Sequence, residues 1–233
     1  MGELLTYERD GDLAVITMDD GKVNALSVDM FAALNDALDQ ADSDAAIVVL
    51  AGRPGVFSAG FDLSTLRGGG VEAVEMLIGG FEFSHRLLSF AHPVIIACTG
   101  HAIAMGLFLV LSGDYRIGAS GSDVKIVANE VAIGLTMPRS AVEICRQRLH
   151  PSHLQRVVNL AEQYTPDGAV EAGLLDRVVP PPDVVPTALE MARSMTGLDR
   201  AAHTGSKRRL REGALAALRA AIDADDADLR SFL

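Results

Sequence analysis

Tryptophan is absent from this chain of 233 residues, and aromatic residues make up only 5% of it. Because large rings are scarce, the core must be built mainly from Ala, Val, Leu and Ile. Cysteine is also rare: Cys98 and Cys145 lie far apart, each among apolar neighbours. This spacing excludes a disulfide framework and a cysteine-rich metal site, so we interpret both thiols as reduced and buried.

Positive charge and long apolar runs are lacking as well. The formal net charge is −11, which disfavours binding to nucleic acid or to an anionic membrane, since both need basic surface. The longest apolar run, residues 95–111, is interrupted by Gly100, His101 and Gly106 and is too short to span a bilayer. The charged N-terminal segment does not resemble a secretory signal. We therefore expect a cytoplasmic protein with no nucleic-acid or membrane partner.

Short apolar runs alternate with helical patterns along the first two thirds of the chain. Two β-like runs, residues 4–9 and 13–18, flank an Asp-Gly-Asp turn that is typical of a hairpin. Further buried strands are expected at residues 46–50, 94–99, 115–117 and 124–127, with residues 100–106 as a loop. This alternation predicts an α/β fold with parallel strands. From about residue 138 the pattern becomes mainly helical.

Two of the expected strands run into loops that contain glycine and then into helices. The loops are residues 57–63 (Phe-Ser-Ala-Gly-Phe-Asp-Leu) and residues 100–106 (Gly-His-Ala-Ile-Ala-Met-Gly). Backbone N–H groups at the start of a helix have no partner within it and carry partial positive charge. Two such ends facing each other would hold a developing oxyanion. Ordinary strand-to-helix turns have the same pattern, so spacing alone leaves both interpretations open.

Glu130 lies in a largely apolar stretch, residues 127–134. Burial among apolar groups would raise the pKa of its carboxyl and suit it to proton transfer near neutral pH. The alternative is a Glu that faces water or pairs with Arg. His101 is interpreted as a positional residue, and neither Ser58 nor Cys98 has the neighbours of a nucleophile.

A basic cluster, residues 207–209, stands in an otherwise acidic chain. We expect it to form a solvated helix face. Contact with a phosphate of coenzyme A is the second possibility.

Five segments in order resemble the crotonase (enoyl-CoA hydratase/isomerase) superfamily. They are the two loops, an early Lys-Val-Asn-Ala-Leu segment at 22–26, an Asn-Glu-Val-Ala-Ile-Gly-Leu segment at 129–135, and an Ala-Val-Glu-Ala-Gly-Leu-Leu stretch that begins at residue 169. Each motif alone is weak, but their ordered succession over residues 4–195 is specific.

The resemblance implies a fold and a set of roles. The fold is a spiral of ββα units over residues 1–190, followed by a helical region at 191–233 that supports trimer contacts. A homotrimer or a dimer of trimers is expected. The N–H groups of Phe61 and Met105 would bind the thioester oxygen of an acyl-CoA substrate, and Glu130 would transfer the proton. No metal or cofactor is implied, because CoA is part of the substrate. The other expected substrate-binding residues are Lys22, Val23, Ala25, Ala59, Gly60, Asp62, Leu63 and Phe108.

Two departures from the family pattern bear on function. Phe108 stands where hydratases of the family usually carry a second glutamate, which favours isomerisation of a β,γ-enoyl-CoA with one Glu as the proton shuttle. Hydration stays open if another carboxylate, such as Glu82 or Glu143, fills that space. Met105 replaces the usual Gly, and it would be strained if the position needs a positive φ and would narrow the acyl channel. A catalytically weak acyl-CoA-binding protein is therefore the third possibility.

Overall fold

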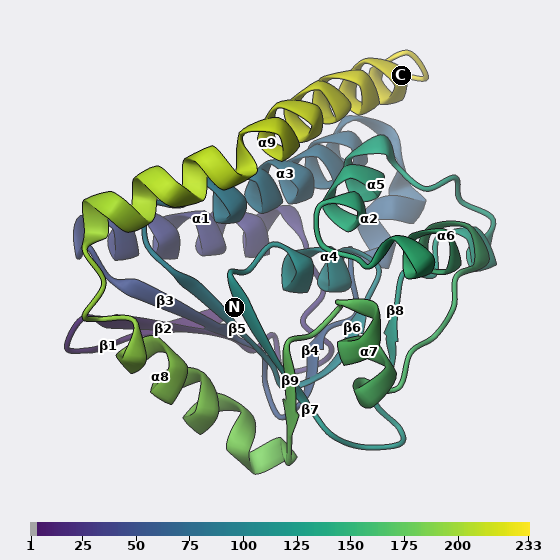
Figure 1. The fold of residues 1–233 in the computed structure, drawn as a ribbon. Coiled ribbons are helices and arrows are strands. Elements are labelled where there is room, and N and C mark those ends of the chain that lie inside the picture. The colour runs from purple at the N-terminus through teal and green to yellow at the C-terminus, as the bar shows by residue number, and fades with distance from the viewer. Residues whose placement is uncertain (1–3) are drawn as a thin grey trace.

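The computed structural model describes residues 4–233 and contains two sheets covered by helices (Figure 1). The large sheet has six strands in the order β1-β2-β3-β5-β7-β9. Strands β1 and β2 form the predicted antiparallel hairpin, and the remaining pairs are parallel. The strands span Leu5–Asp10, Leu13–Met18, Ile47–Ala51, Val94–Cys98, Tyr115–Ala119 and Arg177–Val179.

The small sheet consists of three parallel strands in the order β4-β6-β8, namely Gly55–Ser58, Gly100–Ile103 and Ile126–Val127. The expectation of a loop over residues 100–106 is therefore wrong for its first half, which is strand β6. Gly100 explains the difference, since a Cβ there would collide with the backbone of Gly55. Only glycine allows β6 to approach β4 so closely.

Successive ββα units build both sheets at once. From β3 onward, the first strand of each unit joins the large sheet and the second joins the small sheet. A helix follows each pair, so helices gather beyond the carboxyl ends of the small-sheet strands. The helices are α1 Val28–Ser43, α2 Leu63–Gly68, α3 Gly70–Ser89, α4 Met105–Leu111, α5 Arg139–Arg146, α6 Pro151–Leu160, α7 Pro166–Ala172, α8 Val184–Ser194 and α9 Arg200–Arg230, with 3-10 turns η1 Val131–Ile133 and η2 Pro181–Asp183.

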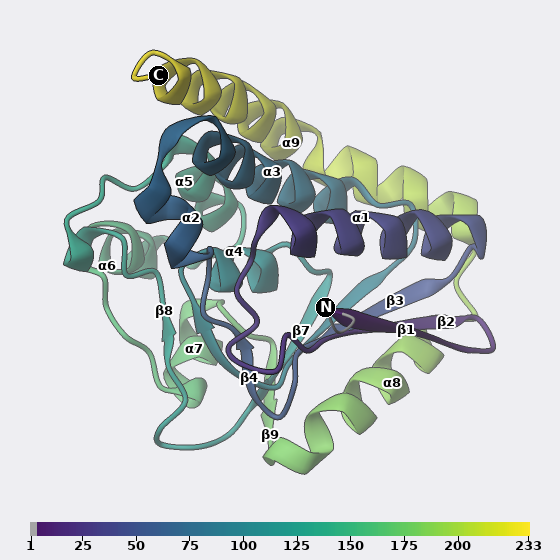
Figure 2. The ribbon, with the colours of Figure 1, turned by 180° about the vertical axis from the view of Figure 1, so that it is seen from behind.

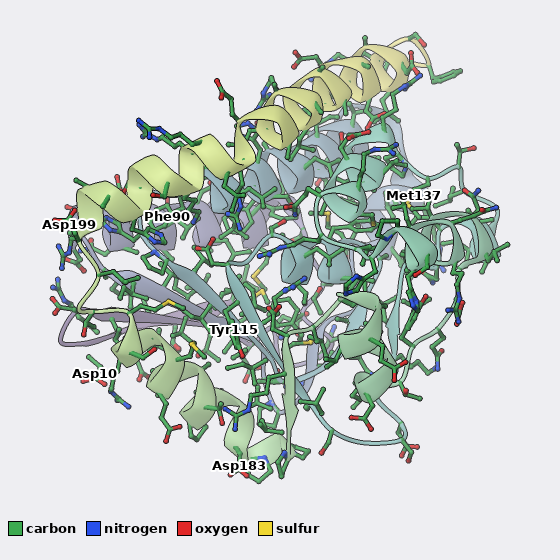
Figure 3. The ribbon with its side chains drawn as sticks, viewed as in Figure 1. Asp10, Phe90, Tyr115, Met137, Asp183 and Asp199 are labelled. Carbon is green, nitrogen blue, oxygen red and sulfur yellow. The ribbon has the colours of Figure 1, made fainter. Side chains whose placement is uncertain are left out.

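The central strands β3 and β5 of the large sheet are buried on both faces, as their continuous apolar sequences predict, whereas the edge strand β1 is largely exposed. In β3, Val48 and Leu50 pack into the main core, whereas Val49 and Ala51 pack into a second core under α8. Figures 1 and 2 show α8 alone on one side of this sheet and α1, α3 and α9 on the other. Side chains fill the space between these layers (Figure 3). Within residues 4–233, no helix combines the length and hydrophobicity needed to cross a membrane.

Helix α9 lies across α3 and α5 of its own chain. The basic cluster on α9 is only partly solvated: Arg208 and Arg209 are exposed, but Lys207 is buried. Its Nζ pairs with Asp114 at 2.7 Å, and Arg211 pairs with the same carboxylate at 2.9 Å. The expectation of a solvated face is thus wrong for Lys207, whose charge joins α9 to the core.

The predicted division between a core of residues 1–190 and a helical region at 191–233 falls within α8. The division into these two domains and the trimer both stay predictions.

Candidate active site

The first loop connects β4 to α2 and contains Ala59, Gly60, Phe61 and Asp62. Asp62 is the N-cap of α2: its carboxylate accepts a hydrogen bond from the N–H of Thr65 at 2.8 Å. Hydrogen bonds from Ser64 and Thr65 hold the pKa of this carboxyl below its usual range, so it serves the helix cap. In contrast, the N–H of Phe61 donates to no acceptor within residues 4–233.

The second loop connects β6 to α4. Met105 is the first residue of α4, its side chain is fully buried in the main core, and its N–H has no acceptor within the described part of the chain. The backbone strain suspected at Met105 lies one residue earlier, at Ala104, with φ 51° and ψ −123°. A positive φ at Ala costs on the order of 1–3 kcal/mol and is typical of functional sites. The Met side chain is accommodated because it points into the core.

Two glycines let the loops meet. A Cβ on Gly60 would lie 3.0 Å from the carbonyl oxygen of Ile103 and 3.5 Å from the nitrogen of Met105. A Cβ on Gly106 would lie 2.5 Å from the carbonyl oxygen of Ser58. The unpaired N–H groups of Phe61 and Met105 therefore belong to backbone segments in close contact.

Glu130 follows β8 and precedes the 3-10 turn η1. Its side chain is buried, with 8% exposed, and its Oε2 has no hydrogen-bond partner among residues 4–233. Desolvation by burial raises the pKa of this carboxyl to about 7, because burial penalises the charged form. Such a group can take up and release a proton near neutral pH.

The small sheet relates the positions of the three predicted catalytic residues to one another. Its strands are parallel, so their carboxyl ends lie at one edge. Phe61, Met105 and Glu130 each follow one of these strands within three residues. The hydrogen bond from Ala104 N–H to the carbonyl of Val127, at 2.9 Å, joins the second loop to the segment that leads to Glu130.

Phe108 on α4 belongs to a row of aromatic rings. It is buried, and its ring centre lies 6.4 Å from that of Phe81. Phe81 in turn meets Phe61 edge-on at 6.2 Å. These rings give the region around Phe61 an apolar lining.

The two other carboxylates considered for the space near Phe108 are engaged elsewhere. Glu82 on α3 pairs with Arg219 on α9, and this hydrogen-bonded pair lowers the pKa of Glu82. Glu143 pairs with Arg146 one turn along α5. Each of these carboxylates therefore has a cationic partner of its own, whereas Glu130 has none among residues 4–233.

The early segment expected to contact CoA lies beside the first loop. Ala59 N–H donates to the carbonyl of Val23 at 3.0 Å. Lys22, Val23 and Leu63 are exposed, and Ala25 is half-buried. These residues leave accessible surface next to the unpaired amide of Phe61.

Two residues that shape this segment were not anticipated. The carboxylate of Asp20 accepts from the N–H groups of Lys22, Asn24 and Ala25. Burial disfavours the charged form of Asp20, but these three backbone donors outweigh it and lower its pKa. Asn24 is buried with φ 52° and donates to the carbonyls of Met18 and Phe57. The Asp-Asp-Gly turn before Asn24 is a signal for such side-chain-to-backbone bonds.

Three residues that the sequence analysis left without a catalytic role have structural contacts. The Oγ of Ser58 donates to the carbonyl of Asn24 and accepts from the N–H of Gly60, so it links the early segment to the first loop. His101 Nδ1 accepts from the N–H of Lys125 at 2.9 Å, which fits a positional role. Burial raises the pKa of the Cys98 thiol to about 12, so its thiolate is not available at neutral pH.

A family model described as "Enoyl-CoA hydratase/isomerase" matches residues 8–233. The chain belongs to the enoyl-CoA hydratase/isomerase family. This confirms the resemblance inferred from the five ordered motifs. Membership also makes the chain an acyl-CoA enzyme at the level of the family.

Relatives within the enoyl-CoA hydratase/isomerase family carry both names. A probable enoyl-CoA hydratase of Mycobacterium avium (strain 104) is 32% identical over 221 residues, covering 93% of this chain and 80% of the relative. A solved enoyl-CoA hydratase of Mycobacterium ulcerans Agy99 is 48% identical, with a TM-score of 0.93 and coverage of 97% of this chain and 99% of that one. A solved Mtb enoyl-CoA isomerase is 47% identical, with a TM-score of 0.93 and coverage of 97% and 99%. These structures confirm the α/β crotonase-like fold, while family membership alone does not choose between the two reactions.

Proposed function

We propose that this protein isomerises a β,γ-enoyl-CoA to the conjugated α,β-enoyl-CoA. The observation that carries the proposal is Glu130: a buried carboxyl with a pKa near 7 and an unpartnered oxygen. It follows one strand of the small sheet, and the free N–H groups of Phe61 and Met105 follow the other two. One proton-transferring group and two oxyanion donors are the parts that a double-bond shift through an enolate requires.

The reaction begins with ionised Glu130, which removes a proton from the α carbon of the thioester. The electron pair of that C–H bond delocalises into a dienolate, whose oxygen accepts hydrogen bonds from the Phe61 and Met105 N–H groups. Protonated Glu130 then returns the proton to the γ carbon, and the double bond comes to lie between the α and β carbons. No water is consumed, and Glu130 ends in its starting state.

The other substrate-binding residues belong to the same proposal. Lys22, Val23 and Ala25 would lie along the CoA portion, beside Ala59 and Gly60 of the first loop. Asp62 would act by capping α2 and so orienting this loop.

Exposed Leu63 and buried Phe108 contribute apolar surface to the site, Leu63 at its exposed side and Phe108 within the protein. A dry environment strengthens the interaction of the two amides with the enolate oxygen.

Hydration of an α,β-enoyl-CoA is the second candidate, and it is favoured by the names of two similar proteins. Adding water requires a water molecule that is held and activated, typically by two carboxylates. Phe108 occupies one of those positions by the resemblance, and Glu82 and Glu143 are paired with arginines. These observations favour isomerisation.

The test is to incubate the protein separately with β,γ- and α,β-enoyl-CoA and to analyse the products. Isomerisation yields the conjugated product from the first substrate and no hydroxyacyl-CoA from the second. Accumulation of 3-hydroxyacyl-CoA would overturn the proposal in favour of hydration. Binding of both thioesters without any product would make the protein an acyl-CoA-binding relative.

A further inference from the structure

Helix α3 contains two adjacent glycines, Gly79 and Gly80, near its middle. Glycine inside a helix costs about 1 kcal/mol relative to alanine. A glycine there calls for a reason, such as a close approach by another part of the molecule.

The two glycines have different surroundings. A Cβ on Gly80 would lie 2.7 Å and 2.8 Å from the Cε1 and Cζ atoms of Phe61, and 3.0 Å from Cζ of Phe31. A Cβ on Gly79 would meet nothing within 4 Å. The Phe61 ring therefore rests directly on the α3 backbone at Gly80.

The Phe61 ring has little freedom to move away from α3. Phe31 meets it edge-on with ring centres 6.1 Å apart, and Phe81 does so at 6.2 Å. Both neighbours are buried, with at most 4% of either residue exposed. In a close-packed interior, a shift of the Phe61 ring must be taken up by its own main chain or by these rings.

The main chain at Phe61 is held on both sides. Leu26 N–H donates to the carbonyl of Gly60 at 2.9 Å, and Asp62 N–H donates to the carbonyl of Leu26 at 3.2 Å. The free N–H of Phe61 lies between these two bonds. This N–H shares one planar peptide unit with the Gly60 carbonyl, so the bond from Leu26 holds its direction while the Phe61 ring rests on Gly80. A displaced ring would strain that bond and turn the unit.

We propose that Gly80 is a positioning residue for the active site: by having no side chain, it seats the Phe61 ring and so sets the direction of the Phe61 N–H. This inference rests on the proposed function, in which that N–H binds the thioester oxygen. Gly80 itself touches no substrate.

The test compares Gly80→Ala with Gly79→Ala. Both changes give the same gain in helix propensity, but only the first places a Cβ against the Phe61 ring. We expect Gly80→Ala to lower kcat by about tenfold to a hundredfold, since small misplacements of catalytic groups cost that much. Its KM should stay within about twofold, and Gly79→Ala should match wild type in both constants.

A Phe61→Leu background provides the second readout, because it removes the ring but keeps the backbone N–H. There, Gly80→Ala should have no further effect on kcat, which a general effect on α3 would not predict. If Gly80→Ala alone does not fold, recovery of folding together with turnover in the Phe61→Leu background supports the same contact.

Two failures can be told apart. A wild-type protein that isomerises while Gly80→Ala behaves like Gly79→Ala overturns the role of Gly80 alone. A kcat loss of equal size in the Phe61→Leu background does the same. A wild-type protein without enoyl-CoA turnover overturns the proposed function, and this inference with it.

Discussion

Two carboxylates in this molecule lie in opposite electrostatic surroundings. Asp114, which leads into β7, has partners on every side: Lys207 at 2.7 Å, Arg211 at 2.9 Å and the N–H of Val94 at 2.8 Å. Glu130, which follows β8, is buried but has an oxygen without a partner in residues 4–233. The first region fastens helix α9 to the core, whereas the second leaves a proton-binding group unpaired.

The difference in hydrogen bonding distinguishes a carboxylate that stabilises the fold from one that is available for catalysis. Buried polar groups are nearly always hydrogen-bonded, because an unpaired one costs about 1–3 kcal/mol. At Asp114 that requirement is met, and the charges contribute to a fixed helix position. At Glu130, and at the N–H groups of Phe61 and Met105, it is not met by any group within residues 4–233, and the proposed function assigns these three groups to the substrate.

The largest expected effect comes from removing the unpaired carboxylate. We expect Glu130→Gln to lower turnover by on the order of 10³-fold, since acid–base groups contribute about 10²–10⁴-fold. Affinity for a CoA ester should be nearly unchanged, because the two amides and the CoA segment remain. Steady-state kinetics and calorimetric titration measure the two quantities.

The matched control for Glu130→Gln is Glu143→Gln, which changes a carboxylate already paired with Arg146. It should keep wild-type turnover. Unchanged turnover in Glu130→Gln would show that this residue has no part in the mechanism. The unpaired carboxyl of Glu130 would then have no catalytic role to distinguish it from Asp114.

Changing a residue that pairs with Asp114 should lower the stability of the fold but leave the turnover of the folded protein unchanged. We expect Lys207→Ala to lower the free energy of unfolding by about 2–3 kcal/mol, since it removes one of the two buried cations that pair with Asp114 and leaves only Arg211. Urea unfolding measures this change, and kcat of the folded fraction should be that of wild type. The exposed neighbour provides the control, as Arg208→Ala should shift stability by less than about 0.5 kcal/mol. Equal losses of unfolding free energy in Lys207→Ala and Arg208→Ala would contradict the role of the buried Lys207–Asp114 pair in stability.

The unpaired carboxyl should also make stability depend on pH. Its pKa is 4.5 ordinarily and about 7 in the folded protein. The folded state favours the neutral form, so this contribution is full below about pH 4.5 and is lost as pH rises to about 7. Glu130→Gln should therefore gain roughly 2–3 kcal/mol over wild type between pH 5 and pH 8.

Urea unfolding of wild type and Glu130→Gln at both pH values measures that gain. In the same pH range, kcat/KM of wild type should rise with pH and level off above about 7, because the ionised form is the base. If the difference in unfolding free energy between wild type and Glu130→Gln did not change with pH, folding would not raise the pKa of Glu130, and this prediction would be wrong.

The smallest effect is expected at the strained residue of the second loop. Ala104→Gly should raise the free energy of unfolding by about 1 kcal/mol, because glycine adopts a positive φ without steric cost. It should also lower kcat, as the amide of Met105 becomes less firmly held.

Ala161→Gly is the control for Ala104→Gly, since Ala161 also has a positive φ, 48°, but caps α6. It should affect stability alone. A loss of stability in Ala104→Gly would mean that the φ of Ala104 carries no strain.

Much of this site could be predicted from the sequence because its parts are local. The loop glycines, the apolar setting of Glu130 and the order of the motifs are properties of short segments. These segments predicted the α/β fold, the hairpin and the residues that follow each small-sheet strand.

What the sequence did not reveal depends on contacts between distant segments. Strand β6 exists because Gly100 approaches Gly55, and Lys207 is buried because Asp114 lies opposite it. Ala104, which has a positive φ, donates its N–H to the carbonyl of Val127, a residue 23 positions away in the sequence. The hydrophobic pattern of a single segment cannot predict contacts between residues that are far apart in the sequence.

The most direct measurement follows one hydrogen atom through the reaction. A β,γ-enoyl-CoA deuterated at the α carbon is converted in a single turnover, and the product is examined by mass spectrometry and NMR. The mechanism predicts that part of the deuterium reaches the γ carbon, with the same carboxyl as carrier, and that Glu130→Gln abolishes both transfer and double-bond migration. Migration at an equal rate in Glu130→Gln, or a product that has gained water, would contradict the account.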